Sequence, residues 1–110
     1  MSKDTIISSR SQLVQYFAIK EKKFNEWKIG TEHEKFIFSL ENFHPVPYKG
    51  KNGIESLLIS LKENSGWKPI NENNNIIGLI AENQSSISLE PGGQQQLSAA
   101  PLENLHMTCD

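Results

Sequence analysis

The sequence of 110 residues contains a single cysteine, Cys109, and has no long apolar run. One thiol cannot form an intramolecular disulfide, and it cannot supply a cysteine-based metal site. The first residues lack the apolar core of a signal peptide, and no stretch approaches the ~20 apolar residues of a membrane span. We therefore expect a cytoplasmic chain in a reducing compartment, without a membrane partner.

The sequence also lacks an excess of charge of either sign. Eleven Lys and Arg residues stand against 13 Asp and Glu residues, which gives a formal net charge of −2. Such a chain has no basic field to attract nucleic acid, so we expect no nucleic-acid partner. The single cysteine and three scattered histidines show no spacing that would place a nucleophile beside a base. With 36% hydrophobic and 22% charged residues, the chain is suited to one small folded domain.

Helical periodicity recurs in two parts of the sequence. Apolar residues at helical spacing follow Ser9 and Ser11, either of which can cap the start of a helix over about residues 10–22. Apolar residues at i, i+3, i+4 and i+7 predict a second helix over residues 54–61, and Gly66 lies where this helix should stop.

Strand patterns occupy most of the remaining sequence. Residues 28–40 alternate between two faces, and three short apolar or alternating runs follow at 76–81, 85–90 and 94–98. We expect an α+β fold with an antiparallel sheet and helices on one side. The turns of the meander should fall at Asn83-Gln84 and at Pro91-Gly92-Gly93, where two glycines can adopt a positive φ.

The end of the sequence predicts a third helix. Pro101 is a favoured first helical residue, and Leu102, Leu105 and Cys109 would lie on one stripe of such a helix. We therefore expect a single partial domain over residues 1–110 that is truncated within a helix after Pro101.

Glu32 and Glu34 are the most informative polar residues. They share a strand face with Phe36, Phe38 and Leu40, the face that a core would otherwise claim. Two carboxylates about 6.5 to 7 Å apart in a partly apolar setting need compensating cations, and Mg²⁺ with oxygen ligands meets that need. Alternatively, this end of the strand lies in solvent and both glutamates are simply hydrated.

Glu90 is a candidate third carboxylate. It ends a predicted strand directly before Pro91, where a side chain can project from the rim of a sheet. The alternative is a polar residue that merely flanks a hairpin turn. His33 falls on the strand face opposite the two glutamates, and His44 and His106 look like surface or loop residues.

Two stretches of sequence resemble the signatures of the glutamate–cysteine ligases of plants and proteobacteria. They are Ile29-Gly30-Thr31-Glu32-His33-Glu34-Lys35-Phe36 and Ser86-Ile87-Ser88-Leu89-Glu90-Pro91-Gly92-Gly93-Gln94, the second followed by Leu97-Ser98 and Ala100-Pro101-Leu102-Glu103. Tyr48, Gly53-Ile54 and Gly66-Trp67-Lys68-Pro69-Ile70 fall in the same order as in that family. The resemblance therefore spans nearly all of the chain from Arg10 onward.

The resemblance implies a partial glutamine synthetase-like carboxylate–amine ligase fold, and an enzyme that uses ATP and Mg²⁺ to join glutamate and cysteine into γ-glutamylcysteine in glutathione biosynthesis. It implies that Glu32, Glu34 and Glu90 bind metal, and that Glu90, Gln94 and Gln96 contact substrate. Enzymes of the family are several times longer than this chain.

The match departs from the family pattern at three positions of the second signature. Gln95 stands where the family has an aromatic residue, Gln96 where it has an acid, and Ala99 where it has glycine. An amide at position 96 keeps the shape of a carboxylate but loses its charge, so metal affinity should fall. We therefore expect an N-terminal ligase fragment that is inactive alone. The alternatives are a subunit that a separate ligase chain completes, and a non-catalytic binding module.

Overall fold

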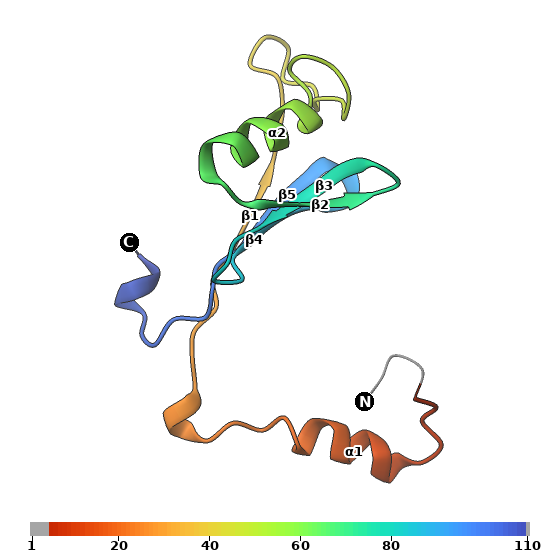
Figure 1. Cartoon of the computed structure of the whole chain (residues 1–110), viewed down its shortest axis with the longest axis vertical. Helices are drawn as coiled ribbons and strands as arrows, with labels where there is room; N and C mark the ends of the chain where they lie inside the picture. The colour runs from red at the N-terminus through yellow and green to blue at the C-terminus, as the bar shows by residue number, and fades with distance from the viewer. Residues whose placement is uncertain (1–4, 110) are drawn as a thin grey trace.

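The computed structural model describes residues 5–109, and these residues fold around a five-stranded antiparallel sheet (Figure 1). The order of the strands is β1-β5-β4-β3-β2, so the last strand of the chain lies between the first and the fourth. The predicted α+β class is confirmed. The elements are α1 (Arg10–Ala18), β1 (Glu32–Phe36), α2 (Ile54–Ser65), β2 (Lys68–Glu72), β3 (Asn75–Ile80), β4 (Ser86–Leu89), β5 (Gln94–Ser98), and three 3₁₀ turns at Phe24–Glu26, Pro91–Gly93 and His106–Thr108.

Helix α2 covers one face of the sheet and begins and ends at glycines. Gly53 is its N-cap, and a side chain there would meet three backbone carbonyl oxygens at 2.7 Å, because the preceding loop folds tightly over this residue. Gly66 is its C-cap with φ of 72°, the left-handed conformation that glycine adopts without strain. The prediction of this helix and of its stop is confirmed.

The core lies between α2 and the β3 side of the sheet. Its buried apolar residues are Ile54, Leu58, Ile76 and Leu79. Between the last two, the β2–β3 register shifts by one residue, and this bulge brings Ile76 back to the same face as Leu79. The Tyr48 hydroxyl donates a hydrogen bond to the Ile76 carbonyl at 2.8 Å, which ties the loop before α2 to the bulged strand.

The sheet contains one strand that the sequence patterns did not indicate. Strand β2 has a proline, Pro69, at its second position and no alternation of apolar residues. It lies at the edge of the sheet and pairs with β3 alone, and an edge strand tolerates a residue without an N–H group. The predicted strand over residues 28–40 shortens to β1, with isolated bridges on either side of it.

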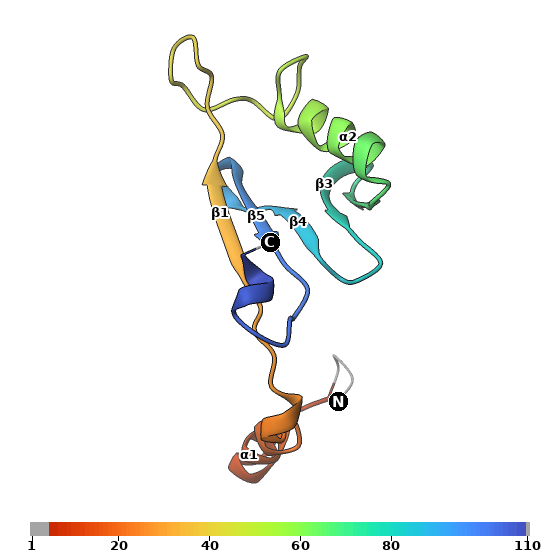
Figure 2. The same cartoon turned by 90° about the vertical axis from the view of Figure 1, so that its left-hand side faces the viewer.

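The first helix is shorter than expected. A capping box between Ser9 and Gln12 starts α1, and the helix ends at Ala18 instead of extending to residue 22. Helix α1 buries none of its residues and lies apart from the sheet (Figures 1 and 2). The expectation that the helices pack on one side of the sheet therefore holds for α2 only.

The prediction of a helix after Pro101 is wrong. Ile29 and Leu102 exchange two backbone hydrogen bonds of 2.7 and 2.8 Å, which hold this part of the chain extended beside the segment that leads into β1. Only a three-residue 3₁₀ turn, His106–Thr108, follows within the described part of the chain. Long-range backbone pairing thus overrides the local helical pattern.

The fold is unusually open for its length. Its radius of gyration is 18.2 Å, whereas a compact domain of this length has about 13 Å. Its accessible surface is 9,204 Å², against roughly 6,100 Å² for a monomeric protein of this mass. Many large apolar side chains remain exposed, among them Phe17 at 70%, Phe24 at 83% and Leu40 at 83%.

Candidate functional site

The five residues predicted to bind metal or substrate gather on or beside the sheet face opposite α2. In the register, Glu34 lies opposite Gln96, and Gln96 lies opposite Ser88 on the next strand. Since directly paired residues of antiparallel strands point to the same side, these three side chains form one row across β1, β5 and β4. A second row joins Glu32, Ser98 and Ser86. We call this surface the polar face.

Glu32 and Glu34 are both exposed on the polar face. The core does not claim this face, because α2 packs against the opposite one; Phe36, which shares the side of the two glutamates, is 69% exposed. The expectation of a partly apolar setting is therefore wrong. Glu32 and Glu34 instead fit the alternative, in which both carboxylates lie in solvent. The placement of His33 on the other face is confirmed, because it lines a cavity beneath α2.

Glu90 stands at the entrance to the turn between β4 and β5. Its carboxylate accepts a hydrogen bond of 2.7 Å from the Ser88 hydroxyl, which holds it toward the polar face. The turn closes through the N–H of Glu90, which donates to the Gln94 carbonyl at 2.8 Å. Gly92 and Gly93 adopt φ of 77° and 79°, as the sequence predicted for this turn.

Gln96, in the middle of β5, is half-buried and already has a partner. Its Nε2 donates to the Ser98 hydroxyl at 3.2 Å, along the same strand and on the same face. Gln94 lies opposite Phe36 at the end of β5 that is nearer the turn. The two glutamines thus extend the line of polar side chains from the two glutamates toward Glu90.

Three serines of the polar face were not among the predicted site residues. Ser86, Ser88 and Ser98 add hydroxyl groups to the rows that contain the glutamates. The alternation of Ser86, Ser88 and Glu90 against Ile87 and Leu89 was visible in the sequence. It indicated a polar strand face, but not which other strand that face would join.

The polar face has the donors for a partial Mg²⁺ site. Among residues 5–109, no group of three or more His, Cys, Asp or Glu residues is arranged to hold a metal ion. Magnesium, however, is commonly bound through one or two carboxylates together with substrate phosphates and water. Glu32 and Glu34 fit such a pair, whereas Glu90 is held by Ser88 and does not join them into a cluster of three.

Comparison with known proteins identifies the family. Residues 28–110 match glutamate-cysteine ligase family 2 (GCS2). The chain is 46% identical over 101 residues to glutamate–cysteine ligase A, chloroplastic, of Oryza sativa subsp. japonica, a match that covers 92% of this chain and 20% of the relative. The chloroplastic ligases of Medicago truncatula and Arabidopsis thaliana are 46% and 45% identical over the same share of this chain, which covers 19% of each of them.

The chain therefore belongs to the glutamate–cysteine ligase family 2 and spans about a fifth of the length of the curated relatives it matches. The resemblance drawn from the two signatures is confirmed. The antiparallel sheet with its helices is consistent with part of a ligase domain.

The expected cytoplasmic location is wrong. The relatives are chloroplastic ligases, so a low cysteine content and a polar start to the sequence do not identify the compartment. Within residues 5–109, no helix has the length and apolar character needed to cross a membrane.

Proposed function

We propose that this chain contributes the acidic sheet of an ATP- and Mg²⁺-dependent ligase that joins glutamate and cysteine into γ-glutamylcysteine, a step of glutathione biosynthesis. One observation carries the proposal. In a member of this family, the two glutamates of the first signature and the polar residues of the second meet on one sheet face, through the pairing of Glu34 with Gln96 and of Glu32 with Ser98.

In this proposal Glu32 and Glu34 hold Mg²⁺ on the exposed end of the polar face. The ion would neutralise charge on the transferring phosphoryl group of ATP and on the carboxylate that attacks it. The side-chain carboxylate of glutamate would attack the γ-phosphorus of ATP and displace ADP, and the amine of cysteine would then attack the acyl phosphate, lose a proton and displace phosphate. Strand β1 orients the two glutamates, since alternate residues of a strand point to one side.

Glu90, Gln94 and Gln96 are proposed to contact substrate. We also propose Glu90 as a further metal ligand, since the hydrogen bond from the Ser88 hydroxyl orients its carboxylate toward the polar face. The Gln96 amide offers both a donor and an acceptor but no charge. We propose that this lost charge lowers metal affinity, and that the chain has no ligase activity by itself.

The open shape favours a second proposal, in which another ligase chain or segment completes the fold. The accessible surface exceeds that of a compact protein of equal mass by roughly 3,000 Å², an amount typical of obligate interfaces. Exposed Phe17, Phe24 and Leu40 are the apolar side chains that such a partner would cover. A non-catalytic binding module on the same sheet would instead bind ligand without turnover.

The experiment is an isothermal titration of the chain with Mg²⁺ in the presence and absence of glutamate. The Glu32→Gln, Glu34→Gln double variant tests the site, and a Glu63→Gln, Glu72→Gln double variant is the control. The control removes the same charge from two exposed carboxylates: Glu63 lies on α2, and Glu72 lies on β2, at the edge of the sheet opposite β1.

We expect a saturable heat of Mg²⁺ binding that only the Glu32, Glu34 variant loses. Equal binding by the chain and both variants would contradict the proposal, because it would show nonspecific attraction to an acidic protein. Circular dichroism on each variant separates a lost site from a lost fold.

A further inference from the structure

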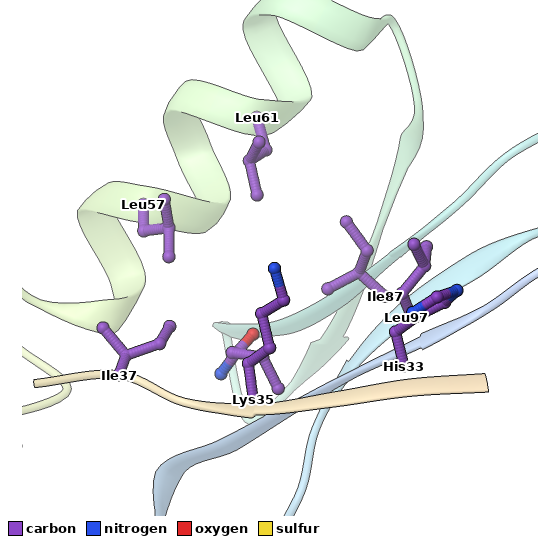
Figure 3. Close-up of a pocket in the computed structure, with 8 residues that line it drawn as sticks. His33, Lys35, Ile37, Leu57, Leu61, Ile87 and Leu97 are labelled. Carbon is purple, nitrogen blue, oxygen red and sulfur yellow. The ribbon is translucent and has the colours of Figure 1, made fainter. Parts of the chain in front are cut away.

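A cavity of about 360 Å³ lies on the other side of the sheet from the polar face, between α2 and strands β1, β4 and β5 (Figure 3). It forms because α2 packs mainly on β3 and leaves the β1 side of the sheet less covered. Its volume is in the range of small-molecule sites. The apolar part of its lining consists of Ile37, Leu57, Leu61, Ile87 and Leu97.

Gln95 lines this cavity with an amide that has no partner. The residue is only 9% exposed, and both its Oε1 and its Nε2 are buried without a hydrogen bond. Buried amide groups are nearly always paired, since an unpaired donor or acceptor is costly. A ligand with an acceptor beside a donor would satisfy both atoms.

Lys35 supplies the charge at the same end of the cavity. It is the direct cross-strand partner of Gln95, so the Cβ atoms of the two residues lie about 4.5 to 5.5 Å apart. Figure 3 shows the Lys35 side chain rising from β1 toward Leu57 and Leu61 of α2. The lining contains this lysine and His33 but no carboxylate, so its charge complements an anion.

We propose that this cavity binds a medium-chain aliphatic carboxylate that carries a hydroxyl group next to the carboxylate. The carboxylate accepts hydrogen bonds from the Lys35 ammonium and the Gln95 Nε2, and the hydroxyl donates to the Gln95 Oε1. The aliphatic tail lies among Leu57, Leu61 and Leu97. This site is separate from the proposed ligase site, because Gln95 and Gln96 point to opposite faces of β5.

The test is a titration of the 110-residue chain with 2-hydroxyoctanoate, followed by calorimetry and by the side-chain amide resonance of Gln95. Two comparison ligands are titrated in the same way: octanoate, which lacks the hydroxyl group, and octylamine, which carries a positive charge in place of the negative one. The variants are Lys35→Met, which removes the charge, and Gln95→Leu, which removes the amide. Lys62→Met is the control, since Lys62 follows Leu61 on α2 but does not line the cavity.

We expect 2-hydroxyoctanoate to bind at least about tenfold, ~1.4 kcal/mol, more tightly than octanoate, and octylamine not to bind. Lys35→Met and Gln95→Leu should each weaken binding of 2-hydroxyoctanoate by about tenfold or more. In the unmodified chain, the ligand should shift the side-chain amide resonance of Gln95. Lys62→Met should bind like the unmodified chain.

Three results would overturn the proposal. The first is the absence of saturable binding, and the second is equal affinity for octanoate, 2-hydroxyoctanoate and octylamine. The third is a dimer in sedimentation velocity that Gln95→Phe dissociates and that 2-hydroxyoctanoate leaves unchanged. That result would assign the cavity to a second copy of the chain. None of these outcomes depends on Glu32 or Glu34, so the ligase proposal stands or falls separately.

Discussion

Replacement of Gln95 by leucine should stabilise this protein, although it removes a polar residue from the middle of a strand. Both polar atoms of the amide are buried without a partner, and the residue is 9% exposed. Leaving such a group unsatisfied costs about 1 to 3 kcal/mol, and leucine has nearly the same size without any polar atom. We expect the free energy of unfolding to rise by about 1 to 2 kcal/mol, within that range.

The assay is urea unfolding followed by far-ultraviolet circular dichroism, at equal protein concentration and without added carboxylates. In thermal unfolding followed by the same signal, 1 kcal/mol corresponds to a rise in Tm of about 4 to 8 °C for a domain of this size. Gln96→Leu is the matched control, because Gln96 is the next residue of β5 but points to the polar face and donates to Ser98. It should not stabilise the chain.

A Gln95→Leu variant that is no more stable than the unmodified chain would refute this reasoning. It would mean that the amide already has a partner in solution, such as a water molecule held in the cavity. An equal gain from Gln96→Leu would also refute it, since the gain would then reflect apolar substitution in a strand and not the removal of an unpaired group.

Three further substitutions test the core, each by the same urea unfolding. Leu58→Ala should cost about 2 to 5 kcal/mol, because Leu58 is fully buried in a core of four residues. A change below ~1 kcal/mol would contradict the assigned core. Gly78→Ala should cost about 1 to 3 kcal/mol, since the added carbon would lie 2.5 Å from the Ile87 carbonyl oxygen, and a neutral result would argue against this close β3–β4 approach. Tyr48→Phe should cost about 1 kcal/mol for its lost hydrogen bond to Ile76, with no effect expected if that hydroxyl instead bonds to water.

Local patterns in the sequence were enough to predict α2 and the meander. The i, i+3, i+4, i+7 repeat ending at Gly66 determines the helix, and Gly92 and Gly93 determine the tight turn between β4 and β5. These signals are local, because the spacing of apolar residues and the need for a positive φ do not depend on distant partners. The face of β1 that carries the glutamates followed from strand alternation alone.

Properties set by distant partners could not be predicted in this way. Leu102 lies in an extended segment because Ile29 pairs with it, whereas the local pattern after Pro101 favours a helix. Which face of β1 lies toward α2 depends on where that helix packs, and all five residues of β1 are exposed, so the apolar residues beside Glu32 and Glu34 gave the wrong indication. The register that places Glu34 opposite Gln96 joins two segments about 60 residues apart in the sequence, and strand patterns alone leave such pairing open.

Gln95 illustrates a different limit. Its position in β5 was evident from the sequence, and so was its departure from an aromatic residue in the family pattern. Whether the amide would point to solvent or into a cavity depended on α2, which lies on its side of the sheet but packs mainly on β3.

The most direct test of the ligase proposal is a chimera. In it, the matched segment of the rice chloroplastic ligase is replaced by the corresponding segment of this chain, and ATP-dependent formation of γ-glutamylcysteine is measured by mass spectrometry. The account predicts activity that Glu32→Gln, Glu34→Gln abolishes, that Glu63→Gln, Glu72→Gln leaves intact, and that Gln96→Glu increases. Activity that survives the Glu32, Glu34 double substitution in a folded chimera would contradict the assignment of the polar face to the ligase site.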